Sequence, residues 1–273
     1  MPITSLTNPR VKDIAALATK KQREETGLFL VEGLQLVGFG VAAGWPLETL
    51  IVRADWESGA RSEAVMNDAR NVANHVLDVD AAVMHKLSNK DNPPTVMGVF
   101  GQRPQALKKV KLEASSVWLI LEEPRDPGNV GTIIRTADAL GASGIIIIPP
   151  ATDIWAPECV RATMGSIFHV PLVKASRTDV LEWVEAQHTF HPQLTLAGLH
   201  LEGETDIRTV ATYAGPTLLA FGTEQTGLSA ELTAACTQLL KIPMAGKAES
   251  LNLAQAAGLT LYETLRERLP ALS

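Results

Sequence analysis

The sequence predicts an α/β protein whose C-terminal part contains a parallel sheet covered by helices on both faces. The segments VWLIL and GIIII are continuously apolar, as are the strands of a sheet that is buried on both sides. Helical patterns alternate with these and later apolar segments, which is typical of parallel sheets. Apolar residues make up 46% of the 273-residue chain and charged residues 20%, so a sizeable core can form.

A second, smaller α/β pattern occupies the first hundred residues. Apolar side chains at helical spacing predict a helix over residues 8–23. The strand-like segments LFLVEG, LETLIV and HVLDV follow, and the turn-rich SNKDNPP precedes a last strand, TVMGVF. Residues 101–114 are polar and poorly patterned. We therefore predict two domains, residues 1–100 and 115–273, joined by a linker over 101–114.

Composition and targeting signals argue against several classes of protein. No apolar run is long enough to span a bilayer, and the N-terminus lacks the apolar region of a secretory signal. Cys159 and Cys236 are the two cysteines of the chain, which suggests neither a disulfide framework nor a metal site. We expect a cytoplasmic protein that binds no membrane and no metal.

The net charge of −6 argues weakly against a nucleic-acid partner, but the charge is unevenly distributed. Residues 1–113 hold 14 Lys and Arg against 13 Asp and Glu, whereas residues 114–273 hold 10 against 17. A local basic patch can bind phosphates even on an acidic protein. Five cations within the first 23 residues are candidate RNA-phosphate contacts: Arg10, Lys12, Lys20, Lys21 and Arg23. The alternative is an ordinary solvated helix face.

The stretch DPGNVGTIIRTADALGA, residues 126–142, follows a predicted buried strand, and ligands bind at the carboxyl ends of such strands. A helix that begins near Gly128 has one apolar stripe, formed by Val130, Ile133, Ile134, Ala137 and Leu140. Arg135 lies on another face, together with Gly128, Gly131, Thr132, Asp138 and Ala142. Small residues there allow a ligand or a second chain to approach Arg135 closely. The alternative is an exposed Arg135–Asp138 pair.

Two further strand ends carry polar and small residues. In FGTEQTGLS, residues 221–229, a buried strand ends at Gly222 and Ser229 can cap the next helix; an ordinary turn is the alternative. In IPMAGKAESLNLAQAAG, residues 242–258, we expect Ser250 to cap a helix from Leu251. Neither loop contains the GxGxxG fingerprint of a dinucleotide-binding protein, and the chain has no P-loop, which argues against an enzyme that uses NAD or a nucleoside phosphate.

Taken together and in this order, the three loops resemble the motifs of the SpoU/TrmH branch of the SPOUT RNA methyltransferases. NVGTIIRTADALGA is similar to the first motif, FGTEQTGLS to the second and IPMAGKAESLNLAQAAG to the third, and RATMGSIFHVPLV resembles the segment between the first two. ITSLTNPRVKDIAAL, LFLVEG and KLSNKDNPPTVMGVF resemble the family's N-terminal substrate-recognition domain, a small ribosomal-protein-like α/β unit.

The resemblance implies a deep trefoil knot in the parallel-sheet domain, a homodimer with its active site near the subunit interface, and S-adenosyl-methionine held by the second and third loops. The cofactor-binding residues that it implies are Gly222, Thr223, Glu224, Ile242, Met244, Leu251 and Asn252. The polar active-site set that it implies is Asn129, Arg135, Glu224, Ser250 and Asn252. The chain departs from the family where Thr223 replaces a frequent Asn, and where Leu253 and Ala254 replace a frequent Val-Ser pair.

The implied reaction is methyl transfer from S-adenosyl-methionine to a ribose 2′-hydroxyl of structured RNA. The presence of two domains favours rRNA over tRNA as the substrate. Arg135 would engage the hydroxyl, either as a base or as an electrostatic clamp, and a guanidinium rarely releases its proton. A non-catalytic RNA-binding protein of the same fold is the alternative.

Overall fold

The computed structural model describes residues 1–57, 59–209, 215–223 and 225–271 in two compact units. The first unit comprises Met1–Arg103 and Asp153–His169, and the second comprises Pro104–Thr152 and Val170–Ser273. This division differs from the predicted boundaries, because the segment 153–169 was expected in the second domain. In addition, Val110 and Leu112 of the predicted linker are buried in the core of the second unit.

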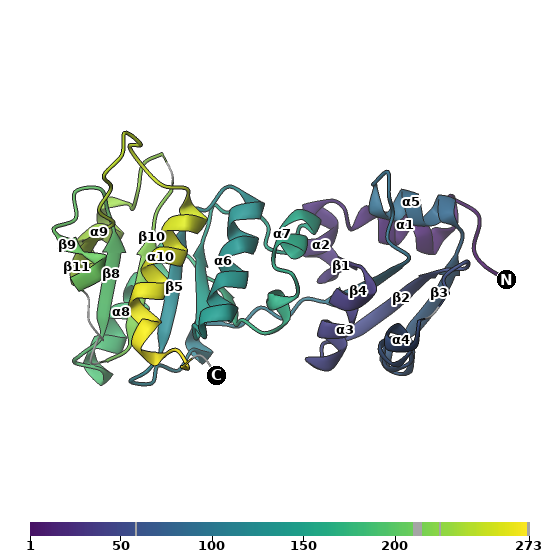
Figure 1. Ribbon diagram of the computed structural model, residues 1–273, viewed down its shortest axis with the longest axis horizontal. Coiled ribbons are helices and arrows are strands. Elements are labelled where there is room, and N and C mark those ends of the chain that lie inside the picture. The colour runs from purple at the N-terminus through teal and green to yellow at the C-terminus, as the bar shows by residue number, and fades with distance from the viewer. Residues whose placement is uncertain (58, 210–214, 224, 272–273) are drawn as a thin grey trace. The chain divides into compact units, whose positions relative to one another are not determined.

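The first unit has a four-stranded sheet in the order β1-β4-β2-β3, in which β1 and β2 run antiparallel to β4 and β3 runs parallel to β2. Its elements are α1 (Pro9–Ala16), α2 (Lys20–Thr26), β1 (Leu28–Glu32), α3 (Leu34–Ala42), β2 (Leu47–Arg53), α4 (Ala60–Val72), β3 (His75–Val79), α5 (Ala81–Ser88), β4 (Val96–Gly101), α7 (Pro157–Ala162) and η2 (Ser166–Phe168). Helices α1 and α5 cover one face of the sheet, and α3 and α4 lie on the other (Figure 1).

The single helix predicted over residues 8–23 is wrong, because the chain forms two helices there. Helix α1 ends at Ala16, and α2 begins at Lys20. The Thr19 hydroxyl accepts a hydrogen bond from the backbone N–H of Gln22 and so caps the second helix. A capping residue between the apolar turns of α1 and the polar residues of α2 therefore divides a segment that the sequence predicts as one helix.

The second unit has a seven-stranded sheet in the order β7-β6-β5-β10-β8-β11-β9, and every described pair of neighbouring strands is parallel. Its elements are η1 (Leu107–Lys109), β5 (Val117–Glu122), α6 (Pro127–Leu140), β6 (Gly144–Ile148), β7 (Leu172–Lys174), α8 (Arg177–Phe190), β8 (Thr195–Leu199), β9 (Thr205–Asp206), η3 (Ile207–Thr209), β10 (Thr217–Phe221), α9 (Ala230–Ala235), β11 (Gln238–Lys241), α10 (Leu253–Leu265) and η4 (Arg266–Arg268). The predicted parallel sheet is confirmed, whereas the knot stays a prediction.

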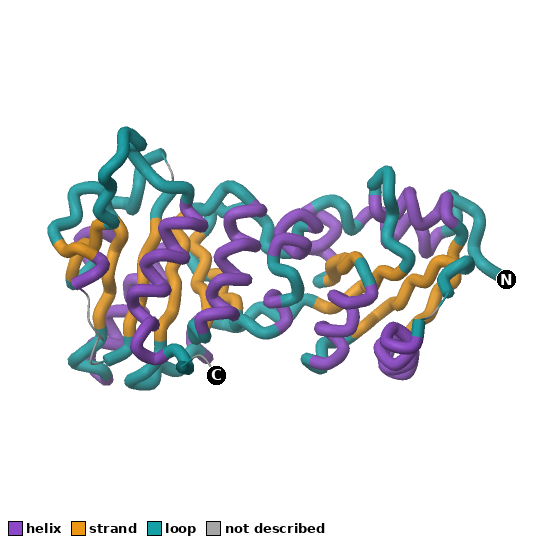
Figure 2. Tube along the Cα trace, in the orientation of Figure 1, coloured by secondary structure: helices purple, strands orange, loops and turns teal. Residues whose placement is uncertain are grey.

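Helices cover both faces of this sheet. Helices α8 and α9 contribute Val180, Val184 and Leu232 to the apolar core on one face. Helices α6 and α10 pack against each other on the opposite face, as the tube in Figure 2 also shows. Strands β5 and β6 are buried along their whole length, which explains their continuously apolar sequences.

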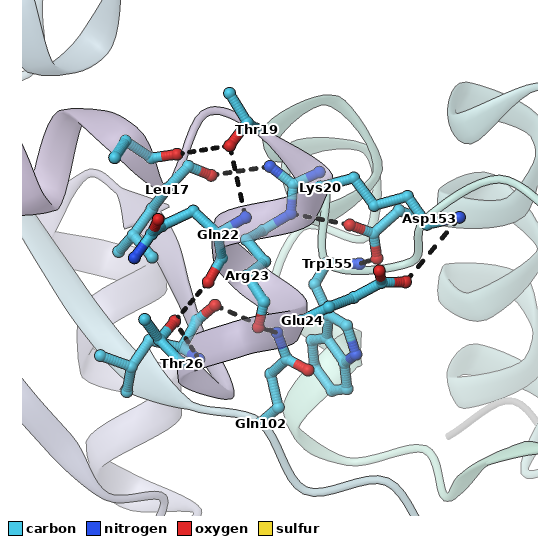
Figure 3. Close-up of polar contacts among 12 residues, drawn as sticks. Leu17, Thr19, Lys20, Gln22, Arg23, Glu24, Thr26, Gln102, Asp153 and Trp155 are labelled. Carbon is cyan, nitrogen blue, oxygen red and sulfur yellow. Dashed lines mark hydrogen bonds and ion pairs between the residues drawn. The ribbon is translucent and has the colours of Figure 1, made fainter.

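The segment 153–169 is fixed in the first unit by one buried ion pair and by aromatic contacts. Arg23 is only 3% exposed; its Nε lies 2.7 Å from Asp153 Oδ2, and its Nη1 donates to the Leu17 carbonyl at 2.7 Å (Figure 3). The Trp155 ring packs on Phe29, with 4.8 Å between the ring centroids. The prediction that Arg23 contacts RNA phosphate is therefore wrong, because its guanidinium is buried and already neutralised.

Replacing Arg23 with alanine should destabilise the first unit by about 3–5 kcal/mol, because the Asp153 carboxylate would stay buried without its partner. Urea unfolding followed by tryptophan fluorescence measures this change. The exposed neighbour Lys21 is the control, and Lys21→Ala should change stability by less than about 0.5 kcal/mol. Equal unfolding midpoints for the two variants would show that the ion pair does not stabilise this unit.

Candidate active site

A cavity of about 390 Å³ opens in the second unit at the carboxyl ends of β8, β10 and β11. Loops that follow these strands, and the segment that leads into α10, form its walls. Six of the predicted site residues line it: Gly222, Thr223, Ile242, Met244, Ser250 and Leu251. Phe221, Leu253 and Ala256 add apolar surface. The cavity has the size and mixed lining that small-molecule sites usually have.

The loop after β10 is closed on itself by short-range hydrogen bonds. Thr223 and Gly227 exchange two backbone hydrogen bonds of 3.1 and 3.0 Å, and the Thr223 hydroxyl accepts from the Thr226 N–H at 3.0 Å. A Cβ on Gly222 would lie 2.0 Å from the Gly227 carbonyl carbon, so this position requires glycine. Thr223 and Gly227 both line the cavity, so these hydrogen bonds hold part of its wall in place. Glu224 lies in this loop but outside the described residues.

Asn252 connects the third loop with the first. Its side-chain oxygen accepts from the Ala254 N–H at 2.9 Å and caps α10, while its Nδ2 donates to Asn129 Oδ1 at 2.9 Å. The expectation that Ser250 caps this helix is wrong, because α10 begins at Leu253. Ser250 is instead exposed and lines the cavity. Asn129 sits in the first turn of α6, where its own N–H donates to the capping carboxylate of Asp126.

A buried carboxylate connects the first and second loops. Glu122, at the end of β5, is 2% exposed and accepts hydrogen bonds from the Ser229 N–H at 2.7 Å and from Arg177 Nε at 2.6 Å. The hydrogen bond to Glu122 raises the pKa of Arg177 above its ordinary value. Arg177 Nη2 also donates to Glu123 at 2.7 Å. Sequence reasoning missed Glu122, because nothing local marks a strand-end glutamate as buried.

Arg135 lies on the exposed side of α6 and forms no hydrogen bond or ion pair with any other described residue. The alternative of an Arg135–Asp138 pair is thus not realised. Its side chain is not among those that line the cavity. The expectation that Gly131 shares this open face is wrong, because Gly131 is buried.

The loop after β8 also lines the cavity, and sequence reasoning missed it. His200, Leu201 and Glu202 contribute to the wall, and the Glu202 N–H donates to His200 Nδ1 at 3.1 Å. The signal that could have revealed it is the apolar strand LTLAGLH, whose carboxyl end falls beside the other two loops. A further contact joins the first two loops, since Arg125 Nη1 donates to Gln225 at 3.2 Å.

Cys236, which packs against the core of the second unit, offers no thiolate. Burial raises the pKa of the Cys236 thiol to about 11, and the charge of Glu122 adds to the effect. The thiol is therefore protonated at neutral pH and a poor nucleophile. Across the described ranges, no three His, Cys, Asp or Glu side chains gather as a metal site would require. No helix in the same ranges is both long and apolar enough to cross a membrane.

Four of the five predicted RNA contacts are exposed on the first unit: Arg10, Lys12, Lys20 and Lys21. Lys20 lies 3.9 Å from Glu24, and Lys21 lies 3.8 Å from Glu25, each as an i,i+4 pair along α2. Such exposed pairs are weak and can be exchanged for other partners. Arg10 and Lys12 form no side-chain hydrogen bond or ion pair within the described part of the chain.

Both units match known protein families. Residues 8–98 match the MRM3-like substrate binding domain. Over 257 residues, the chain is 34% identical to the 23S rRNA (uridine(2479)-2′-O)-methyltransferase of Streptomyces viridochromogenes, covering 93% of this chain and 88% of that protein.

Solved structures agree in fold over nearly the whole chain. The AdoMet-bound rRNA methyltransferase from Sinorhizobium meliloti is 42% identical with a TM-score of 0.89, and the match covers 99% of each chain. The SpoU methyltransferase AviRb from Streptomyces viridochromogenes, in complex with AdoMet, is 33% identical with a TM-score of 0.86 and coverage of 96% and 98%. Since residues 116–262, more than half of the chain, match the family model as well, this protein belongs to the SpoU rRNA Methylase family.

Proposed function

We propose that this chain transfers a methyl group from S-adenosyl-methionine to a ribose 2′-hydroxyl of rRNA in the cytoplasm. The observation that carries the proposal is the cavity at the ends of β8, β10 and β11, where two separate sequence motifs meet. The names of the relatives and the two AdoMet-bound structures support the same cofactor and substrate class.

The described cavity fits S-adenosyl-methionine in size and chemistry. Ile242, Leu251 and Ala256 offer apolar surface that suits an adenine ring, and Gly222 lines the cavity without a side chain. The bound cofactor supplies an already activated methyl group. The protein therefore has to align the acceptor hydroxyl and manage its proton, and alignment alone can supply about 7–11 kcal/mol.

Arg135 is the candidate group for the acceptor side of the reaction. A guanidinium keeps its proton at neutral pH, so we assign it to binding an RNA phosphate or to stabilising negative charge on the 2′-oxygen. Its exposure and its lack of a partner among the described residues leave it available for this role. Asn129, Ser250, Asn252 and Glu224 complete the proposed polar set; the first three are placed on two of the loops described above.

Arg135→Ala should lower methylation of rRNA about 100- to 1,000-fold, the usual cost of removing a group that stabilises developing charge. Cofactor affinity should stay unchanged, because Arg135 does not line the cavity. Arg135→Lys distinguishes the two roles, since lysine keeps the charge but cannot form a bidentate phosphate contact. Turnover is measured by transfer of radiolabelled methyl groups. Near-normal turnover of the alanine variant would eliminate both roles.

We also propose that the chain works as a homodimer through α10. Three exposed residues lie at i, i+4 and i+7 along this helix, Gln255, Leu259 and Tyr262, and the exposed Arg266 follows at its C-terminal end. Leu259 and Tyr262 are 48% and 50% exposed, which is unusual for adjacent large apolar side chains on a helix that packs on α6. A second copy seated here would lie next to the α6 helix that carries Arg135.

Sedimentation of the Leu259→Glu, Tyr262→Lys double variant tests the dimer. The unaltered chain should sediment as a dimer and the double variant as a monomer. The reason is that charged side chains are costly to bury in an interface, whereas the leucine and tyrosine that they replace are not. Phe190→Glu is the control, since Phe190 is also exposed but lies on α8. A double variant that still sediments with the mass of a dimer would exclude this face as the interface.

A further inference from the structure

The first unit contains its own cavity, which the proposed active site does not use. It has a volume of about 380 Å³, comparable to that of the cofactor cavity, and its lining comes entirely from residues 10–99. Helices α1 and α2 form one side, and the sheet face beneath them forms the floor. The apolar lining consists of Leu28, Leu77 and Val99 from the sheet and of Ile14 and Leu17 from α1 and its C-terminal cap.

Several polar side chains that line this cavity make no hydrogen bond or ion pair within the described ranges. Thr49 is 9% exposed, lines the cavity, and its hydroxyl makes no hydrogen bond within the described ranges. The side chains of Arg10, Asp13 and Gln22 also make no hydrogen bond within the described ranges. These three residues and Glu48 form the rim of the cavity. The Thr49 hydroxyl is therefore available to a ligand or to water in the cavity.

The backbone of the sheet is irregular at this point. The register between β2 and β4 shifts between Leu47 and Thr49, so Glu48 is the extra residue of a bulge. Bulges redirect side chains and occur frequently beside binding sites. Here the bulge lets the adjacent residues Glu48 and Thr49 both line the cavity, although neighbours in a regular strand point to opposite faces.

The charges of the rim identify the kind of ligand. Among the lining residues described, the carboxylates of Asp13 and Glu48 face one guanidinium, that of Arg10, and His75 lies 3.9 Å from Glu48, so the rim offers mainly hydrogen-bond acceptors. Flat apolar surface combined with donors and acceptors at the edge suits a nucleobase. Carboxylates accept hydrogen bonds from exocyclic amino groups, which cytosine, adenine and guanine carry and uracil lacks.

We propose that this cavity binds one unpaired, amino-bearing nucleobase of the RNA substrate. The proposal rests on the proposed RNA methyltransferase function. It assigns to the first unit the recognition of a base, in addition to contacts with phosphates. The match of residues 8–98 to a substrate binding domain is consistent with this role, since it contains every lining residue except Val99. Asp13 is the acceptor on the rim that has no partner among the described residues, and it carries the test.

The test compares Asp13→Asn with Asp68→Asn in binding of the full chain to a 23S rRNA transcript at fixed salt. Asp68 is exposed on α4 and does not line the cavity. Both changes remove one negative charge, so electrostatics alone would strengthen RNA binding in both variants. If Asp13 accepts from a base, Asp13→Asn should instead weaken binding about tenfold, while Asp68→Asn should not weaken it. Equal affinities of the two variants would overturn the proposal.

Photocrosslinking identifies the occupant. A benzoylphenylalanine at Thr26, on the rim, should crosslink to an unpaired cytidine, adenosine or guanosine, whereas the same probe at Asp68 should not select that nucleotide. Crosslinks from position 26 to helical RNA, to uridine or to a protein would overturn the proposal. Methylation by the unaltered chain is measured in parallel. Its absence would refute the proposed function itself, whereas methylation with equal affinities of the variants would refute only the base site.

Discussion

The candidate active site depends on hydrogen bonds that join loops from distant parts of the sequence at one edge of the sheet. Asn252 donates to Asn129 across 123 positions, and Glu122 accepts from the Ser229 N–H across 107 positions. These loops are irregular backbone, which by itself is costly to order. Each contact uses a group that is buried or that caps a helix end. The same hydrogen bonds therefore stabilise the fold and also offset part of the conformational entropy lost in ordering the loops.

This arrangement separates the two parts of the proposed chemistry. The cofactor cavity is formed by loops after β8, β10 and β11, while Arg135 projects from the exposed face of α6. A rigid cavity can hold the methyl donor before RNA arrives, and an arginine without a partner in the described structure can meet a phosphate or the reacting hydroxyl. The first unit adds a buried anchor at Arg23 and Asp153 and a cavity of its own.

Sequence patterns predicted the features that depend on local periodicity. The parallel sheet, the helix that carries Arg135, and six of the residues that line the cavity of the second unit follow from apolar spacing, from strand ends and from the family resemblance. Features that depend on distant partners could not be read locally. Arg23 stands in a basic run and appears solvated, but its partner is 130 residues away. Ser250 and Asn252 are both good caps, and Asn252, which caps α10, also donates to the distant Asn129.

We propose that the closed loop at Gly222 forms one wall of an S-adenosyl-methionine site. Calorimetric titration with S-adenosyl-homocysteine tests it most directly, comparing the unaltered chain with Gly222→Ala and Gly246→Ala. A Cβ at Gly222 meets backbone at 2.0 Å, whereas one at Gly246 meets nothing within 4 Å. We predict that the unaltered chain and Gly246→Ala bind one ligand per chain, and that Gly222→Ala binds at least about 100-fold more weakly, because the loop must move. Equal affinity of all three proteins for S-adenosyl-homocysteine would show that the Gly222 loop does not form this site.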